Sequence, residues 1–286
     1  MPLRSYLFVP GDSESKLAGA QRYGADALIL DLEDSVAPTR KAAARVMIAA
    51  WLLEASQRRG PKCYVRINAM DSGEAAADLA AVMPGRPDGI VLPKSEPRWL
   101  QALSAQLDRL ESEHSIAVGN TRVIAIATET AAAVFAIGNY AGISARLQAL
   151  TWGGEDLAAA LAAVNRRPDG GYEDTFRLAM SLCVLGASAA GVDAIDSACM
   201  DFGDLARFER ECIAARRAGY SAKLAIHPKQ VPIINATFTP SAEEVQWARR
   251  VVAAFSAQPQ LGVVGIDGKV IDRPHLRLAE RLLARL

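Results

Sequence analysis

Eight short apolar runs recur along the chain, and longer segments with helical patterning separate most of them. The runs are SYLFVP at 5–10, ALILDLED at 27–34, CYVRIN at 63–68, GIVLPK at 89–94, VIAIAT at 123–128, ALTWGG at 149–154, DAIDSA at 193–198 and KLAIHP at 223–228. Their lengths and their branched residues are typical of strands that are buried on both faces. The pattern therefore predicts eight buried strands.

The segments between the runs carry helix signals. Helices are predicted at 13–24, 38–60, 97–114, 173–191 and 204–219. The first two begin and end with residues that favour helix termini, and the other three show an apolar stripe with a period of 3.6 residues. Strands that alternate with helices pair in parallel through right-handed crossovers. Eight such units predict an α/β fold of the (β/α)8 TIM barrel type.

A doubly wound open sheet is the alternative fold. Such a sheet usually has fewer strands and often carries a glycine-rich phosphate turn. The pattern G-x-G-x-x-G is absent, and VPGDSES at 9–15 lacks the G-K-[ST] of a P-loop. The barrel is therefore the favoured prediction.

The pattern changes after the eighth run. Residues 1–235 are predicted to form the barrel, which would be the catalytic domain, and residues 236–286 a C-terminal helical and hairpin lid segment. A helix is entered through Pro240 and Ser241, a short hairpin follows with Asp267 and Gly268 as its turn, and a last helix ends the segment. This segment is predicted to be an appendage to the barrel.

Composition narrows the class of protein. The chain has 286 residues with 32 basic and 32 acidic side chains, so its formal net charge is zero. Nucleic acid and membranes are therefore not expected as main partners, whereas an anionic small ligand is compatible with local charge. No signal peptide or membrane-spanning run is evident, and four scattered cysteines are expected to be free thiols. A cytoplasmic location is predicted.

Polar side chains gather where the predicted strands end. They are Asp31, Glu33 and Asp34, then Arg66 and Asn68, Lys94, Glu129, Glu155 and Asp156, Asp196, and His227. Active sites of (β/α)8 barrels lie at the carboxyl ends of the strands, and buried charges are costly unless they are paired or bind a metal. The joint pattern therefore predicts a functional site at the barrel mouth.

Glu129 and Asp156 come from adjacent predicted strand ends. Two carboxylates, with water and substrate oxygens completing the shell, make an open octahedral Mg²⁺ site. Taken singly, each residue also has a structural interpretation: Glu129 in a first helical turn, Asp156 as a helix cap, Arg66 as the ion-pair partner of Asp31 or Glu33. The three histidines are spread along the chain, which argues against a zinc site.

Seven segments occur in a familiar order. They are RSYLFVPGDSESKL, LILDLEDSVAPTRKAAAR, VRIN, IVLPKSE, TETAAAV, LTWGGEDL and AIHPKQVPIIN. Together they resemble the citrate lyase β-subunit-like family, which includes malyl-CoA and citramalyl-CoA lyases, in the HpcH/HpaI aldolase superfamily. The resemblance runs from Arg4 to GKVIDRP in the tail. It implies a barrel that uses Mg²⁺, with Mn²⁺ as an alternative, to make or break a carbon–carbon bond beside an acyl-CoA thioester.

The resemblance also implies roles for individual residues. Glu129 and Asp156 would bind the metal, Arg66 would hold the 2-keto acid and polarise its carbonyl, and Glu33 and Asp34 would support them. Gly154 and Glu155 would contact the substrate, while Arg4 and Lys16 would meet the CoA phosphates. Asp272, in VIDRP, would be the acid or base that the C-terminal segment of a neighbouring subunit brings to the site, so a homotrimer or hexamer is implied.

Three other functions share many of these features. They are a class II pyruvate-type aldolase that works without CoA, a malyl-CoA thioesterase, and a citrate lyase β subunit that acts only within a complex. Asp272, Arg4 and Lys16 favour a CoA-dependent enzyme over the CoA-free aldolase. The nature of the hydroxyacyl group is left open, because malyl, citramalyl and citryl groups differ only by small substituents.

Overall fold

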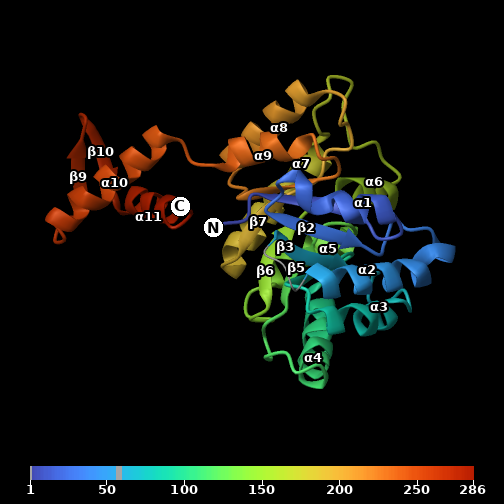
Figure 1. The fold of residues 1–286 in the computed structure, drawn as a ribbon. Coiled ribbons are helices and arrows are strands. Elements are labelled where there is room, and N and C mark those ends of the chain that lie inside the picture. The colour runs from blue at the N-terminus through green and yellow to red at the C-terminus, as the bar shows by residue number, and fades with distance from the viewer. Residues whose placement is uncertain (1, 56–59) are drawn as a thin grey trace.

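Eight parallel strands close into a barrel in the computed structural model, which describes residues 2–55 and 60–286 (Figure 1). The strands are β1 (Ser5–Pro10), β2 (Ala27–Asp31), β3 (Lys62–Arg66), β4 (Gly89–Leu92), β5 (Arg122–Ile126), β6 (Leu147–Thr151), β7 (Asp193–Asp196) and β8 (Ala222–Ala225). Each pairs with the next in sequence, and β8 pairs with β1. The predicted (β/α)8 fold is confirmed, with each strand inside or within two residues of its apolar run.

Helices surround the barrel. They are α1 (Glu14–Gly19), α2 (Lys41–Ala55), α3 (Ala75–Val82), α4 (Pro97–Glu113), α5 (Ala131–Ala136), α6 (Gly154–Leu161), α7 (Asp174–Ala190), α8 (Leu205–Ala218) and α9 (Gln230–Phe238). The five predicted helices are present, although residues 56–59 of the predicted helix 38–60 lie outside the described residues. None of the helices in the described segments is both long and apolar enough to cross a membrane.

Alternate residues of the strands enter two separate cores. One set, which includes Tyr6, Ile29, Tyr64 and Ile124, fills the inside of the barrel. The other set packs against the surrounding helices in the larger core. Successive strand residues point to opposite sides, so Asp31 and Arg66, which continue the inner set at the ends of β2 and β3, point into the barrel mouth.

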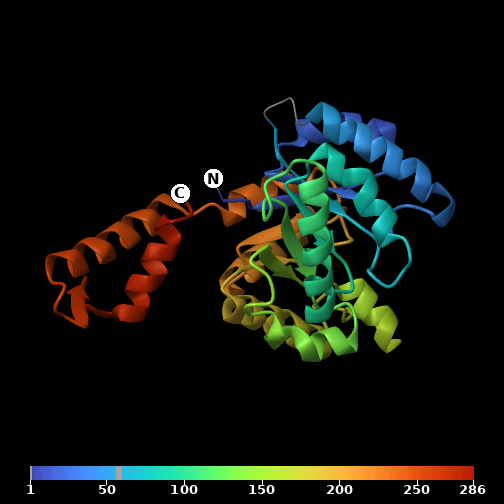
Figure 2. The ribbon, with the colours of Figure 1, turned by 90° about the horizontal axis from the view of Figure 1, so that it is seen from below.

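The C-terminal segment forms a small unit beside the barrel (Figures 1 and 2). It contains α10 (Ala242–Ala257), β9 (Val263–Ile266), β10 (Lys269–Asp272) and α11 (Arg273–Leu283), which share a core of their own. Ser241 and Glu244 form a capping box at the start of α10. Asp267 and Gly268 both have positive φ, as the predicted two-residue hairpin turn requires.

The four cysteines are free, as expected, and all are at least partly buried. Burial raises the pKa of the Cys63 and Cys212 thiols to about 12. Thiols with such pKa values are poor nucleophiles, so the cysteines contribute to packing.

Candidate active site

A cavity of about 350 Å³ opens at the carboxyl ends of the strands. Its lining includes most of the predicted site residues, namely Asp31, Asp34, Arg66, Glu129, Gly154, Glu155 and Asp156. Apolar side chains complete the wall, among them Phe8, Ile126 and Leu224, which belong to strands β1, β5 and β8. The cavity therefore combines an acidic rim with an apolar floor.

Arg66 is fixed by two carboxylates and one ring. Asp31 lies directly opposite Arg66 in the β2–β3 register and accepts hydrogen bonds from its Nε and Nη2 at 2.7 and 2.8 Å. Glu33 Oε2 lies 3.0 Å from Arg66 Nη1, and the guanidinium stacks over Phe8 with 4.8 Å to the ring centroid. Such a clamp orients the guanidinium before any ligand arrives.

The charges of this cluster depend on each other. Burial by itself would raise the pKa of Asp31, but the charge and hydrogen bonds of Arg66 outweigh it and hold that pKa below its ordinary value. Burial is the larger effect for Glu33, whose pKa is raised despite Arg66 and Lys94. Arg66 itself stays charged, because Asp31 and Glu33 more than offset the cost of burying it. The structure thus shows Arg66 paired with both acids.

Glu129 stands immediately before α5 as a buried carboxylate with few partners. Its Oε2 accepts a hydrogen bond from the backbone N–H of Lys94, and Thr130 caps the helix in its place. Burial, followed by the nearby charges of Glu33 and Asp156, raises the pKa of Glu129 to about 8. Glu129 precedes the N-cap Thr130 and so does not lie in the first turn of α5, which rules out the first-turn interpretation.

Asp156 reaches the cavity from the first turn of α6, whose N-cap is Gly153. The structural interpretation of Asp156 as the cap is therefore wrong. The loop before α6 is held by the N–H of Gly153, which donates to Thr128 Oγ1 at 3.0 Å. A Cβ on Gly153 would lie 2.5 Å from Glu129 Cγ, so only glycine permits this approach. The GG pair in the sequence was the available signal for this requirement, which sequence reasoning missed.

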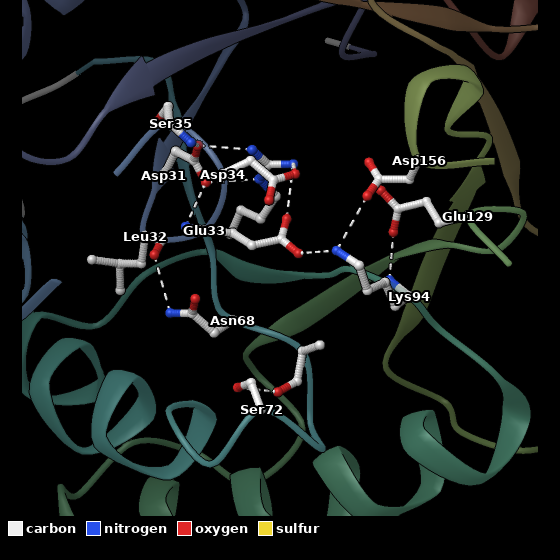
Figure 3. A network of polar contacts seen from close by, with 12 residues as sticks. Asp31, Leu32, Glu33, Asp34, Ser35, Asn68, Ser72, Lys94, Glu129 and Asp156 are labelled. Atoms are coloured by element: carbon white, nitrogen blue, oxygen red, sulfur yellow. Dashed lines mark hydrogen bonds and ion pairs between the residues drawn. The ribbon is translucent and has the colours of Figure 1, made fainter. Parts of the chain in front are cut away.

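Lys94 joins the two halves of the acidic rim (Figure 3). Its Nζ lies 2.7 Å from Glu33 Oε1 and 3.3 Å from Asp156 Oδ1, while its own N–H binds Glu129. Its φ of 47° lies in the left-handed region, which non-glycine residues rarely adopt outside functional or strained sites. The sequence placed Lys94 at a strand end but gave no indication of these contacts.

The acidic rim fits a divalent cation. Glu129 and Asp156 lie side by side at the rim in Figure 3, and Glu33 Oε2, although buried, accepts no hydrogen bond from the described residues. No set of three or more His, Cys, Asp or Glu side chains within residues 2–55 and 60–286 is arranged to share one metal. Mg²⁺ commonly binds through one or two carboxylates and keeps several waters, which the pair Glu129 and Asp156 satisfies.

Arg4 does not lie at the cavity. It precedes β1, at the amino ends of the strands, and its guanidinium binds both carboxylate oxygens of Asp26 at 2.8 Å and Thr239 at 2.8 Å. The two ends of a barrel strand face opposite directions, so Arg4 cannot reach the mouth of its own barrel. The CoA contact predicted for Arg4 is corrected to a structural ion pair that ties β1 to the start of β2.

The remaining candidates lie on the mouth side. Lys16 is exposed on α1, which directly follows β1. Glu155 lines the cavity and accepts a hydrogen bond from Asn165 Nδ2 at 2.8 Å. Asp34 is more than half exposed and lies 3.8 Å from Arg66 Nη1.

Three polar residues from the strand ends belong to the outer layer. Asp196 accepts a hydrogen bond from Trp152 Nε1 and pairs with the buried Lys223. Asn68 binds Lys41 and Asp78. His227 stacks on Phe202 with ring centroids 4.7 Å apart and accepts a hydrogen bond from the N–H of Lys229. These side chains support the packing around the mouth and do not line the cavity.

Asp272 lies outside the cavity of its own chain. It caps α11, where it contacts His275, and this contact holds the pKa of Asp272 below its ordinary value. The far end of α11 lies by the amino ends of the strands, where Arg285 pairs with Asp193 at 3.4 Å. Within one chain the structure therefore does not bring Asp272 to the other candidates.

The contact between Gly153 and Glu129 gives a first prediction. We expect Gly153→Ala to weaken Mg²⁺ binding by roughly 10–100-fold, the usual cost of disturbing the groups that orient metal ligands. Isothermal titration calorimetry measures this effect directly. Gly138→Ala is the matched control, because a Cβ added at Gly138 would meet no atom within 4 Å and its φ is not positive. Equal Mg²⁺ affinity in the two variants would contradict the proposed position of the metal.

Fold and cavity together define a (β/α)8 barrel with an acidic, arginine-containing site at the carboxyl ends of its strands, the place where enzymes with this fold carry out catalysis. The family model described as HpcH/HpaI aldolase/citrate lyase matches residues 4–228. The chain belongs to this family, as the resemblance predicted, and it is a carbon–carbon lyase by family.

Similar proteins span nearly the whole chain. A mitochondrial citramalyl-CoA lyase from Rattus norvegicus is 32% identical, covering 99% of this chain and 86% of its own length. A (3S)-malyl-CoA thioesterase from Cereibacter sphaeroides is 35% identical, covering 99% and 94%. The crystal structure of CitE from Mycobacterium tuberculosis with magnesium, acetoacetate and coenzyme A has a TM-score of 0.78 and 33% identity, covering 99% and 97%. The structure of the citrate lyase β subunit from Mycobacterium tuberculosis has also been solved with oxaloacetate and magnesium.

Proposed function

We propose that this protein is a Mg²⁺-dependent CoA-ester lyase, which cleaves or forms the carbon–carbon bond of a β-hydroxyacyl-CoA. The products of cleavage are acetyl- or propionyl-CoA and a 2-keto acid. The observation that carries the proposal is the pairing of the buried Glu129 with the partly exposed Asp156 beside the clamped guanidinium of Arg66. The citramalyl-CoA lyase name of one relative and the magnesium and coenzyme A in the CitE complex support it.

Glu129 and Asp156 would hold Mg²⁺, or Mn²⁺ in its place. When bound there, the metal supplies a Lewis acid that lowers the pKa of a substrate hydroxyl and stabilises negative charge on oxygen. Arg66 would bind the same end of the substrate, because a guanidinium is a permanently charged, forked donor for carboxylate and carbonyl oxygens. Glu33 and Asp34 would keep Arg66 in position, and Gly154 and Glu155 would contact the substrate from the cavity lining.

In the cleavage direction the substrate hydroxyl would give its proton to solvent water at the cavity opening, and its oxygen would form the carbonyl of the keto acid. The electrons of the broken carbon–carbon bond pass to the thioester, which leaves as an enolate. Asp272 would give a proton to the enolate carbon, or remove one in the condensation direction. The apolar floor around Phe8, Ile126 and Leu224 would exclude water from this step.

Asp272 lies away from the cavity of its own chain, which favours a role in the site of a second subunit. We propose that the segment 236–286 closes over the mouth of a neighbouring barrel in a homotrimer or hexamer. Its surface carries apolar residues that are about half exposed or more in the single chain, namely Val263, Val270 and Leu278.

Lys16 would meet the CoA phosphates, since it is an exposed cation on the mouth side. A cytoplasmic location remains part of the proposal.

A malyl-CoA thioesterase is the second candidate function, favoured by the thioesterase relative at 35% identity. Hydrolysis requires only that water reach the thioester in the same site. The CoA-free aldolase is disfavoured by the tail with Asp272. A β subunit that acts only within a complex would be inactive on free acyl-CoA.

The cavity charge leads to a prediction of substrate. Arg66 is the one cationic side chain among the described residues that line the cavity, and the nearby ammonium of Lys94 already pairs with two acids of the rim, Glu33 and Asp156. A second carboxylate on the keto acid would therefore lack a partner, and unpaired buried charge is costly. We expect glyoxylate or pyruvate to react with acetyl- or propionyl-CoA at least ~10²-fold faster, as kcat/KM, than oxaloacetate, because leaving polar groups unpaired costs this much or more.

A mass-spectrometric screen of both acyl-CoAs against the three keto acids measures this preference. Oxaloacetate binds in a solved complex of the Mycobacterium tuberculosis citrate lyase β subunit. The screen therefore compares the rates at which the three keto acids react, and not whether they bind. A preference for oxaloacetate would contradict the argument from cavity charge, but it would not contradict the proposed lyase function. Release of free malate without glyoxylate from malyl-CoA would identify the thioesterase, and inactivity with every free acyl-CoA would favour the complex-bound subunit.

A further inference from the structure

Lys94 is placed so that its ammonium occupies the acidic rim. The ammonium lies within ion-pair distance of Glu33 and Asp156, and the N–H of the same residue binds Glu129. One residue thus contacts both proposed metal ligands and the acid that holds Arg66. Figure 3 shows these three carboxylates arranged around the Lys94 side chain.

The backbone at Lys94 supports a specific role. Its φ of 47° costs free energy for a residue with a Cβ, and such strain persists where the surrounding structure enforces it. The loop is held on the far side, since the N–H of Ser95 donates to the carbonyl of Ile126 and its hydroxyl contacts Tyr140. The side chain of Lys94 is still about one third exposed, so it has room to move toward the cavity opening.

The geometry points to Lys94 as a built-in cation of the metal site. Its ammonium neutralises Glu33 and Asp156 when no divalent ion is bound, and it must leave Asp156 when the ion enters. Lys94 is therefore a positioning residue that keeps the rim assembled and competes with the metal. This inference rests on the proposed Mg²⁺ site, and it adds that the chain sets its own Mg²⁺ affinity through one lysine.

The competition has a defined direction. Two like charges within a few ångströms repel, and in a partly buried site the repulsion is not fully screened by water. Binding of Mg²⁺ must therefore displace the ammonium and break its contacts. A variant without the Lys94 ammonium binds Mg²⁺ without having to displace it. In the absence of Mg²⁺, the same variant leaves Glu33 and Asp156 without the ammonium as a counter-ion.

Lys94→Met tests the inference, because methionine keeps a long unbranched side chain and the backbone N–H without the charge. We expect Mg²⁺ to bind about tenfold or more tightly to this variant by calorimetry, at about pH 9 so that the carboxylates are ionised. We also expect the melting temperature without metal to fall, and the rise on adding Mg²⁺ to exceed that of the unchanged protein. Lys94→Arg, which keeps the charge, should remain close to the unchanged protein in Mg²⁺ affinity.

Lys62→Met is the matched control, since Lys62 pairs with Asp88 at the amino end of β3, away from the cavity. It should leave Mg²⁺ affinity unchanged. Equal or weaker Mg²⁺ binding by Lys94→Met, with normal binding by the unchanged protein, would overturn the role of Lys94 and leave the proposed function intact. Failure of the unchanged protein to bind Mg²⁺ would instead overturn the metal site itself, and the inference with it.

Discussion

Glu129→Gln is expected to abolish measurable Mg²⁺ binding and to lower lyase activity by at least ~10²-fold. Glutamine has nearly the same shape but offers a neutral amide in place of a ligand carboxylate, and loss of the groups that merely orient ligands already costs about 10–100-fold. Calorimetry measures the loss of binding, and the lyase rate as a function of Mg²⁺ concentration measures the loss of metal dependence. Glu129→Ala should give the same loss of metal dependence.

The same substitution is expected to stabilise the metal-free protein. The pKa of Glu129 is raised from 4.5 to about 8, mainly by burial and then by Glu33 and Asp156. The folded state therefore binds a proton that the unfolded state releases between these two values, so the free energy of unfolding decreases as pH rises from about 4.5 to about 8. Glutamine does not ionise, so the Glu129→Gln variant should keep the free energy of unfolding that the unchanged protein loses over this pH range.

Thermal unfolding without metal at a series of pH values measures the effect. The melting temperature of Glu129→Gln should exceed that of the unchanged protein by a margin that grows with pH and levels off above about 8. Glu96→Gln is a suitable control, because Glu96 is an acid outside the cavity lining that pairs with Arg98. A Glu129→Gln variant that binds Mg²⁺ normally, or that is less stable than the unchanged protein at pH 8, would contradict the assignment.

The barrel was predictable because its signals are local. Most of the apolar runs are short, rich in branched residues and followed by a helix signal, and a parallel sheet requires that arrangement. The hairpin turn at Asp267 and the cap at Ser241 were also predictable, since both depend on residues within four positions. The ends of the strands differ from the ends of the apolar runs by up to three residues, because pairing between neighbours decides them.

The site was only partly predictable, because strand position does not reveal side-chain direction. Arg66 and Asp31 continue the inner set of their strands and meet at the mouth, whereas Asp196 continues the outer set and meets Lys223. Counting alternate positions along β7 separates Asp196 from the mouth, since Ile195 faces inward. The close approach of Gly153 to Glu129 joins residues from two loops, so the GG pair indicates a tight backbone but not which side chain approaches it.

Asp272 raises a different question, since its surroundings in one chain are those of a surface helix cap. Its carboxylate is about half exposed and contacts His275, which keeps its pKa low and makes it a weak base. Burial at the mouth of a neighbouring barrel would work in the opposite direction, because desolvation favours the neutral form of a carboxylate. We therefore expect Asp272 to act as an acid or base only where a neighbouring barrel buries it.

Asp272→Asn is expected to lower the lyase rate by ~10²-fold or more while Mg²⁺ affinity and keto acid binding stay unchanged, as loss of a general acid or base does. Asparagine is also a good helix cap, so α11 should remain folded. Steady-state kinetics and calorimetry on the same preparation give the two readouts. Asp267→Asn, in the hairpin turn of the same segment, should leave both unchanged; a full lyase rate in Asp272→Asn would remove this residue from the mechanism.

Mixed oligomers decide whether Asp272 serves its own barrel or a neighbouring one. Co-expression of Asp272→Asn with Glu129→Gln, each carrying a different affinity tag, yields assemblies in which both chains are defective. If the segment 236–286 closes over a neighbouring barrel, some sites combine an intact Glu129 with an intact Asp272, and random mixing should restore up to about a quarter of full activity. If each tail serves its own barrel, every site keeps one defect and the doubly purified assemblies stay inactive. Because Asp272 and the cavity lie apart in the single chain, we expect restored activity.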